Sequence, residues 1–339
     1  MTMDRKRRIA IVAGGYSSEY PVSLRSAESI RNFLDPALYD PLLVIMERGS
    51  WRAELPDGTT VPVDRNDFSI TVKGEKTDFD LAYITIHGTP GENGLLQGYF
   101  DMLGIPYSCC GVFAAALTFN KYACNHYLAS FGINISPSLL IRRGDKVTPQ
   151  EVADKVTYPC FVKPNDGGSS FGTTKVKTPG EFLPALEKAL AEGEEAVAEK
   201  FMPGTEVTCG CYKAGGRSVA FPITEVVSHK EFFDYEAKYN GAVEEITPAR
   251  IPDALARRIQ QTTLRIYDLI GCRGIIRADY IIIGEEPYLL EVNTTPGMTA
   301  TSFIPQQAKA LGVPMRDILT EIIEDAIKNN PSRKQDAKN

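Results

Sequence analysis

Short apolar runs and helical periodicities alternate along the first third of the chain. Residues 9–13 form a continuous apolar run, which predicts a buried strand over residues 8–13, and residues 23–34 repeat apolar positions with the period of an amphipathic helix. The same patterns predict further strands at 39–46, 81–86 and 106–108 and a helix at 95–103. This alternation indicates an α/β domain built on a parallel sheet, which we expect to end near Gly111.

The pattern changes after residue 111. Helices are expected over 112–131, followed by a small α+β unit with strands at 158–163, 173–177 and 196–202 and a helix at 181–191. Beyond it we predict strands at 206–212, 219–227, 274–283 and 287–292 and helices at 253–270, 305–311 and 315–328. The expected fold class is therefore α/β, α+β in parts, with domains spanning 1–111, 112–202 and 203–330 and a polar tail at 331–339.

Composition and charge narrow the class of protein. A chain of 339 residues is longer than a domain with a single hydrophobic core usually is. Its composition, 43% hydrophobic and 24% charged residues, is typical of a soluble globular protein. The net charge of −6, without a long block of one sign, argues against nucleic acid or a membrane as a partner. The first apolar run is too short for a signal peptide, and no run is long enough to span a membrane, so we expect a cytoplasmic protein.

The chain has seven cysteines, which are scattered and form no Cys-x-x-Cys pair. An odd number at irregular spacing is not the pattern of a disulfide framework. We expect small buried hydrophobic side chains in a reducing compartment rather than a metal site.

Residues 164–172 form a turn rich in glycine and serine between two predicted strands. Glycine lets the backbone approach a ligand closely, and the successive N–H groups of Gly168, Ser169 and Ser170 can cradle phosphate oxygens. Lys163 adds a positive charge just before the turn. The Walker pattern GxxxxGK[ST] is absent, so a flexible hairpin over a nucleotide fits better than a P-loop, with an ordinary Gly/Ser turn as the alternative.

Two predicted strands place polar side chains among strongly apolar neighbours. Arg277 and Asp279 share one face of their strand, and Glu291 and Asn293 share one face of the next. If the turn centres on Glu285, Asp279 lies opposite Glu291 and Arg277 opposite Asn293, unless a bulge intervenes. Two carboxylates and an amide oxygen would then converge as ligands suited to Mg²⁺, with a solvated strand face as the alternative.

Three further segments carry weaker indications. Residues 199–202 end a predicted strand whose backbone could bind an adenine edge, and Glu206 beyond them could accept hydrogen bonds from ribose. Glu19 follows the first strand, where open α/β sheets bind ligands, and could hold an ammonium group. Residues 233–239, with Lys238 and Tyr239, could form a lid. A plain strand end, a generic turn and a solvated loop are the respective alternatives.

Five segments in this order resemble the D-alanine–D-alanine ligases of the ATP-grasp superfamily. They are residues 14–27 (GGYSSEYPVSLRSA), 87–98 (HGTPGENGLLQG), 162–172 (VKPNDGGSSFG), 234–239 (DYEAKY) and 277–299 (RAD…EVNTTPGMT). The resemblance covers nearly the whole chain. It implies a Rossmann-like N-terminal substrate domain followed by central and C-terminal ATP-grasp subdomains that clamp a nucleotide, the last of which carries the metal site.

The resemblance also implies roles for particular residues. The catalytic set is Glu19, Ser169, Tyr239 and Arg277. The substrate-binding set is Glu19, His87, Arg277, Gly297, Ser302 and Phe303. The ATP-binding set is Lys121, Lys163, Ser169, Ser170, Glu199, Lys200, Phe201, Met202, Glu206 and Lys238. Two Mg²⁺ or Mn²⁺ ions would be held by Asp279, Glu291 and Asn293. The chain departs from the family pattern at Tyr20-Pro21, Asn93, Asn120 and Asn125-His126.

A family member would join two D-alanine molecules through a D-alanyl phosphate, releasing ADP and phosphate, for peptidoglycan precursor synthesis, and would commonly be a homodimer. Three alternatives stay open at this point. A sister ligase would make D-alanyl-D-lactate or D-alanyl-D-serine, although a histidine tends to replace the lid tyrosine in the lactate enzymes. The others are a catalytically inactive ATP-binding module and another ATP-grasp enzyme, such as a carboxylase or an L-amino-acid ligase.

Overall fold

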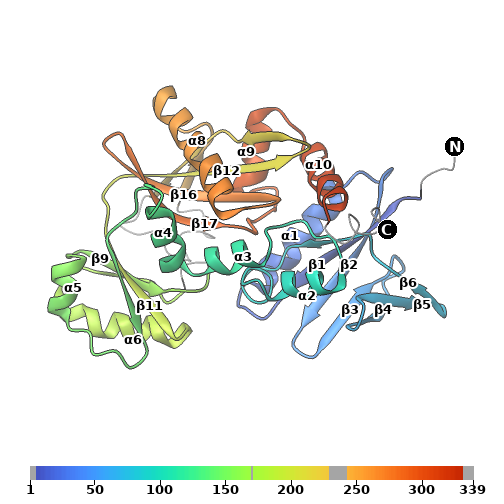
Figure 1. Cartoon of the computed structure of the whole chain (residues 1–339), viewed down its shortest axis with the longest axis horizontal. Coiled ribbons are helices and arrows are strands. Elements are labelled where there is room, and N and C mark those ends of the chain that lie inside the picture. Colours follow the sequence, from blue (N-terminus) through green and yellow to red (C-terminus); the bar gives the residue numbers. More distant parts are fainter. Residues whose placement is uncertain (1–4, 169–170, 229–242, 331–339) are drawn as a thin grey trace.

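The computed structural model describes residues 5–168, 171–228 and 243–330, and its strands form three sheets (Figure 1). The first sheet lies at the right of the view, the second at the lower left and the third above them. The predicted domain boundaries at residues 111 and 202 fall between the sheets and stay a prediction.

The first sheet is mixed. Strand β1 (Arg7–Gly14), the second strand from one edge, lies between β2 (Tyr39–Glu47) and the edge strand β7 (Leu81–Ile84) and is parallel to both, as predicted. Beyond β2 the sheet continues through antiparallel strands that the sequence analysis missed. They are β3 (Ser50–Glu54), β4 (Thr60–Asp64), β5 (Ser69–Val72) and β6 (Glu75–Thr77). The strand predicted at 106–108 is reduced to one bridge between Tyr107 and Ala82.

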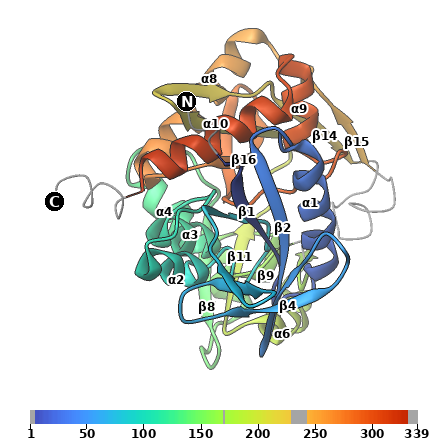
Figure 2. The same ribbon diagram turned by 90° about the vertical axis from the view of Figure 1, so that its right-hand side faces the viewer.

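Two distant helices cover one face of this sheet. Helix α1 (Tyr20–Phe33), with a proline in its first turn, buries Ala27 and Ile30. Helix α10 (Met315–Lys328) adds Ile318 and Leu319 to the same apolar cluster (Figure 2). Helix α10 therefore packs on the domain in which the chain begins. Helix α2 (Leu95–Leu103) lies over the other face, where Leu96 and Phe100 are buried.

The helical segment after the first domain breaks at Asn120. The break separates α3 (Val112–Phe119) from α4 (Lys121–Ala129). Asn120 has an extended backbone (φ −90°, ψ 99°), and its side chain accepts a hydrogen bond of 2.8 Å from Ala123 N. This is an N-cap, which satisfies one of the free N–H groups at the start of a helix. The cap fixes Lys121 in the first turn of α4.

The second sheet is antiparallel, in the order β10-β9-β11-β8. Its strands are β8 (Ser138–Arg142), β9 (Cys160–Pro164), β10 (Thr174–Val176) and β11 (Glu195–Lys200). Helices α5 (Pro149–Lys155) and α6 (Phe182–Glu192), the latter preceded by the 3₁₀ turn η1 (Pro179–Glu181), bury apolar residues against it. Neither β8 nor α5 was predicted.

The third sheet pairs β12 (Thr205–Ala214) with β16 (Ile275–Ile283) and β14 (Thr224–Ser228). It also contains β13 (Arg217–Ala220), β15 (Val243–Ile246) and β17 (Glu286–Asn293). The single strand predicted at 219–227 is wrong, because β13 and β14 are separated by a segment containing Pro222, which lacks an N–H group for a ladder. Helices α8 (Asp253–Ile270) and α10 occupy the predicted ranges, and α9 (Phe303–Leu311) begins two residues earlier than expected.

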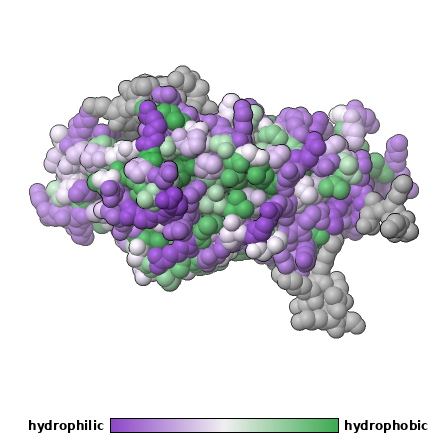
Figure 3. All heavy atoms as spheres, turned by 90° about the horizontal axis from the view of Figure 1, so that it is seen from above, coloured by the Kyte–Doolittle hydropathy of each residue, from purple (hydrophilic) through white to green (hydrophobic). Residues whose placement is uncertain are grey.

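All seven cysteines are buried and free, as expected. In the described part of the chain, no helix is both long and apolar enough to cross a bilayer. Hydrophilic side chains cover much of the face seen from above, with apolar patches near its middle (Figure 3).

Candidate active site

Two adjoining cavities lie where the three sheets meet. The larger has a volume of about 900 Å³ and the smaller about 290 Å³. Both are lined by Glu19, Lys121, Gly168, Arg277 and Glu291. Large cavities with convergent charged groups are the usual places for ligands, so these two form the candidate active site.

The hairpin of β16 and β17 has the predicted pairing at the site. Arg277 lies opposite Asn293, and Asp279 lies opposite Glu291. The register then shifts, and Tyr280 pairs with Leu289, which leaves Leu290 as the extra residue of a β-bulge. Because of the bulge, the turn falls between Ile283 and Glu286 and is not centred on Glu285. The turn prediction was therefore wrong, although the functional pairs were predicted correctly.

Arg277 and Asp279 form a bidentate ion pair on β16. Nε of Arg277 lies 2.8 Å from Oδ1 of Asp279, and Nη2 lies 2.7 Å from Oδ2. Thr208 Oγ1 donates a further hydrogen bond of 2.5 Å to Asp279. Burial by itself disfavours the charged guanidinium, but Asp279 and Glu291 outweigh it and raise the pKa of Arg277. The guanidinium is thus a fixed positive charge at the floor of the site.

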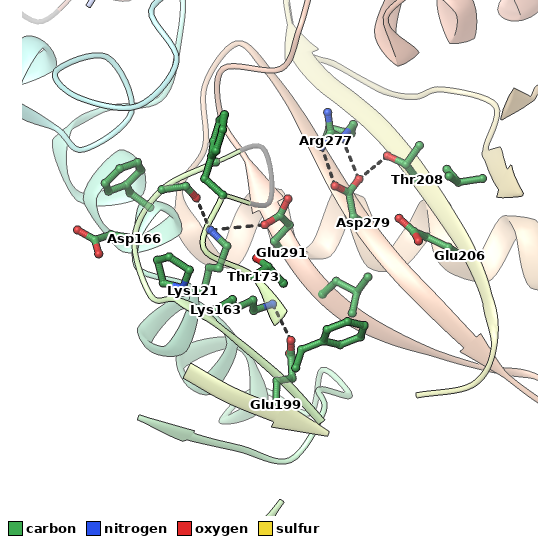
Figure 4. Close-up of a pocket in the computed structure, with 18 of the residues that line it drawn as sticks. Lys121, Lys163, Asp166, Thr173, Glu199, Glu206, Thr208, Arg277, Asp279 and Glu291 are labelled. Atoms are coloured by element: carbon green, nitrogen blue, oxygen red, sulfur yellow. Dashed lines mark hydrogen bonds and ion pairs between the residues drawn. The ribbon is translucent and has the colours of Figure 1, made fainter. Parts of the chain in front are cut away.

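Two lysines face this hairpin from the other wall (Figure 4). Lys121 Nζ lies 3.7 Å from Glu291 Oε2 and donates to the carbonyl of Gly167. Lys163 Nζ lies 2.6 Å from Glu199 Oε2, and the two side chains are only 17% and 6% exposed. Burial lowers the pKa of Lys163, but Glu199 raises it by more, so the lysine stays charged.

The end of β11 forms the far wall of the larger cavity, together with Phe201, Met202 and Glu206. The N–H groups of Lys200 and Phe201 donate to the carbonyls of Pro137 and Pro159. These two N–H groups are thus already engaged within the protein. Backbone recognition of a base by this segment would have to use the chain beyond them, around Met202.

Glu19 lies at the N-cap position of α1 and faces the glycine-rich turn. A methyl group added to Gly168 would lie 2.6 Å from Glu19 Oε2, so the two segments are in tight contact. His87, which follows β7, is buried beside Ser26, with Nε2 3.5 Å from the serine hydroxyl. Both Glu19 and His87 line the smaller cavity.

The opposite side of the smaller cavity is the turn that leads into α9. The Ser302 hydroxyl accepts a hydrogen bond of 3.1 Å from Thr299 N, and a methyl group on Gly297 would lie 3.0 Å from the Ser302 oxygen. Arg277 lies over the ring of Phe303, with Cζ 5.3 Å from its centre. The predicted substrate residues are thus brought together around one cavity. Ser169, Ser170, Lys238 and Tyr239, as well as the rest of the expected lid, lie outside the described residues.

Glu92 is a site residue that the sequence analysis did not single out. Its Oε2 accepts a hydrogen bond of 2.6 Å from Gly88 N, and it lines the smaller cavity. Burial, and after it the charge of Glu19, raise the pKa of Glu92 to about 8. The segment HGTPGENG contains this residue, but only its histidine was given a role.

The chain matches two family models, one after the other along its length. The model of the D-ala D-ala ligase N-terminus matches residues 8–110, and that of the D-ala D-ala ligase C-terminus matches residues 127–324. The D-alanine–D-alanine ligase of Bacteroides fragilis (strain YCH46) is 62% identical over 321 residues, covering 94% of this chain and 99% of that protein. That of Parabacteroides distasonis is 56% identical over 329 residues, covering 97% and 100%.

Solved structures share the architecture. The VanG D-Ala:D-Ser ligase from Enterococcus faecalis has a TM-score of 0.85 at 29% identity, covering 95% of this chain and 100% of that one. A D-alanine–D-alanine ligase from Bacillus anthracis complexed with ATP has a TM-score of 0.77 at 28% identity, covering 97% and 99%. The three-sheet arrangement described above is therefore the ATP-grasp fold of these ligases.

Proposed function

This chain belongs to the family of D-alanine–D-alanine ligases, and from this premise we propose how its residues join two D-alanine molecules at the expense of ATP. The observation that carries the proposal is that lysines line one side of the larger cavity and carboxylates the other. The lysines are Lys121 and Lys163 and the carboxylates are Asp279 and Glu291, with Lys121 Nζ 3.7 Å from Glu291 Oε2 (Figure 4). Cations on one wall and hard oxygen ligands on the other are what a metal-bound triphosphate requires.

ATP would lie in the larger cavity, with its base near Met202 and its ribose at Glu206. Lys121 and Lys163 would contact the phosphates, with Ser169, Ser170 and Lys238 closing over them. Because Lys163 is held by Glu199, its ammonium group is already oriented before the nucleotide binds. Such preorganised positive charge stabilises a phosphoryl group as it is transferred.

The proposed metal site consists of Asp279, Glu291 and Asn293. Its donor set, two carboxylates and an amide on paired strands, fits Mg²⁺, since each carboxylate has acceptor capacity beyond its contacts with Arg277, Thr208 or Lys121. In the described ranges no three His, Cys, Asp or Glu residues form a group that could hold a metal ion. The ions would neutralise phosphate charge when bound.

The first D-alanine would place its ammonium group at Glu19, near His87, and its carboxylate toward the γ-phosphoryl group. Carboxylate attack on that phosphorus gives D-alanyl phosphate and ADP. The second D-alanine is held through its carboxylate at Ser302 beside Phe303. Its neutral amine then attacks the acyl carbon, displaces phosphate and releases a proton to solvent as the amide forms. Arg277 and the N–H of Gly297 would stabilise the oxyanion. Ser169 and Tyr239 would close the site, since water would hydrolyse the acyl phosphate.

The decisive experiment is ATP-dependent phosphate release with D-alanine, L-alanine, D-serine and D-lactate in parallel, with product analysis. We expect D-alanine alone to support rapid release and to give D-alanyl-D-alanine. The similarity to a D-Ala:D-Ser ligase makes the D-serine arm necessary. Equal rates with D- and L-alanine would reject the proposal in favour of another ATP-grasp activity, and no release would indicate an inactive binding module.

We further propose a cytoplasmic homodimer. The cytoplasm supplies ATP, and an apolar patch on α2 and α3 supports self-association. The patch consists of Leu95, Met102, Val112 and Phe113, which are 62%, 82%, 40% and 60% exposed. Sedimentation equilibrium should give twice the mass of the chain, and a monomer at micromolar concentration would reject this assignment.

A further inference from the structure

Arg25 lies on α1, six residues beyond Glu19, and lines the smaller cavity together with Glu19 and Val22. Its side chain is exposed at the mouth of that cavity. The neighbouring Ser26 hydroxyl lies 3.5 Å from Met298 N, so this part of α1 packs against the turn that carries Ser302. Arg25 and Ser302 therefore border the same space.

Among the residues that the structure describes, three lysine and arginine side chains line the smaller cavity, and two of them already contact carboxylate or carbonyl oxygens. Arg277 is held by both oxygens of Asp279, and Lys121 by Gly167 and Glu291. Arg25 has no ion pair and no side-chain hydrogen bond with any described residue. Of these three cations, Arg25 is therefore the one that can bind an anion entering from solvent without breaking a contact within the protein.

The distance along α1 between Glu19 and Arg25 is close to the length of the dipeptide product. Six residues at ~1.5 Å each separate the two positions by about 9 Å along the helix. An extended dipeptide is about 7 Å long, with an ammonium group at one end and a carboxylate at the other. We propose that Arg25 binds the carboxylate of the second amino acid, so that Glu19 and Arg25 hold opposite ends of D-alanyl-D-alanine.

This assignment rests on the proposed ligase reaction and adds a specificity-determining residue to it. The Ser302 hydroxyl is already hydrogen-bonded to Thr299, so a carboxylate there gains from a cation that can donate two parallel hydrogen bonds. The arginine favours acceptors that carry a free carboxylate and directs that carboxylate away from the phosphates. The acceptor amine is thereby turned toward the acyl carbon.

The test compares binding of D-alanyl-D-alanine and D-alanyl-D-alaninamide by calorimetry in the presence of ADP and Mg²⁺. Wild type should bind the acid about 10- to 100-fold more tightly than the amide, which is the range of a charged hydrogen bond. In Arg25→Gln the acid should lose that advantage while the amide binds as before, and Arg25→Lys should keep part of it. Arg31→Gln is the control, because Arg31 lies on the same helix, pairs with Glu28 and does not line the cavity.

The turnover readout is the KM for the second D-alanine, which should rise in Arg25→Gln by the same factor while the KM for ATP is unchanged. An unchanged preference for acid over amide in Arg25→Gln, or equal binding of both by wild type, overturns the role of Arg25. Absence of D-alanine-dependent phosphate release in wild type would instead reject the proposed function. The two failures are therefore distinguishable.

Discussion

The backbone of Gly168 lies in close contact with the carboxylate of Glu19. A methyl group added to Gly168 would lie 2.6 Å from Glu19 Oε2, so the carboxylate would have to move. We predict that Gly168→Ala displaces Glu19 and raises the KM for the first D-alanine at least tenfold, because the ammonium ligand moves. The KM for ATP should change less. Steady-state kinetics with each substrate varied in turn will check this.

Gly180→Ala is the matched control for this prediction. An added methyl group there meets no atom within 4 Å, and its turn η1 lies away from both cavities. Its kinetics should equal those of wild type. Equal KM values for Gly168→Ala and Gly180→Ala would mean that the contact with Glu19 does not position the carboxylate.

The paired carboxylates of β16 and β17 lead to a second prediction. Asp279→Ala and Glu291→Ala should each abolish ATP-dependent phosphate release, and removal of Mg²⁺ with EDTA should do the same to wild type. Glu286→Ala, at the exposed end of the same hairpin, should keep near-normal turnover, because its ion pair with Arg258 lies at the surface. Near-normal turnover of either site variant would refute the metal assignment.

The register of this hairpin shows what the sequence could predict and what it could not. Strict alternation along two apolar strands was enough to pair Asp279 with Glu291. The bulge at Leu290 and the displaced turn depend on how the strands twist and pack, which alternation does not encode. The two differences compensate, which is why the functional pairs are correct despite the wrong turn.

Elements with little apolar content of their own were missed. Strand β6 (Glu75–Thr77) has no buried residue, and β4 has one, Val63, so neither shows a clear period. Their place in the sheet is decided by pairing with neighbours. Similarly, Asn120 ends one helix and caps the next, but its sequence neighbourhood reads as continuously helical. Glu92 was passed over because its burial is created by the fold.

The Lys163–Glu199 pair is predicted to matter for stability as well as for ATP. Lys163→Met leaves a carboxylate that is 6% exposed without its partner, which should lower the free energy of unfolding by about 3–5 kcal/mol. The double variant Lys163→Met/Glu199→Met removes both charges and should recover much of that loss, although neither variant should bind ATP well. Urea denaturation without nucleotide measures both. Equal destabilisation in the single and double variants would contradict the interpretation.

Glu92 gives the last prediction, which concerns pH. Its pKa is raised to about 8 by burial and by Glu19, so between pH 5 and 8 the folded protein keeps a proton that the unfolded chain has released. Stability conferred by this group therefore falls as pH rises, by about 1.4 kcal/mol per pH unit. Glu92→Gln removes the titration, so its free energy of unfolding relative to wild type should increase from pH 5 to pH 8.

The measurement is urea denaturation in EDTA without nucleotide, because a bound cation near Glu92 would lower the pKa of its carboxyl group. The facing groups Glu19, Lys121 and Glu291 are present in both proteins, so their own titration largely cancels in the difference. Glu286→Gln, an exposed carboxyl on β17, should differ from wild type by a nearly constant amount over the same range. A constant difference for Glu92→Gln as well would show that Glu92 ionises alike in the folded and unfolded chains, and would place a charged carboxylate beside Glu19 in the substrate cavity.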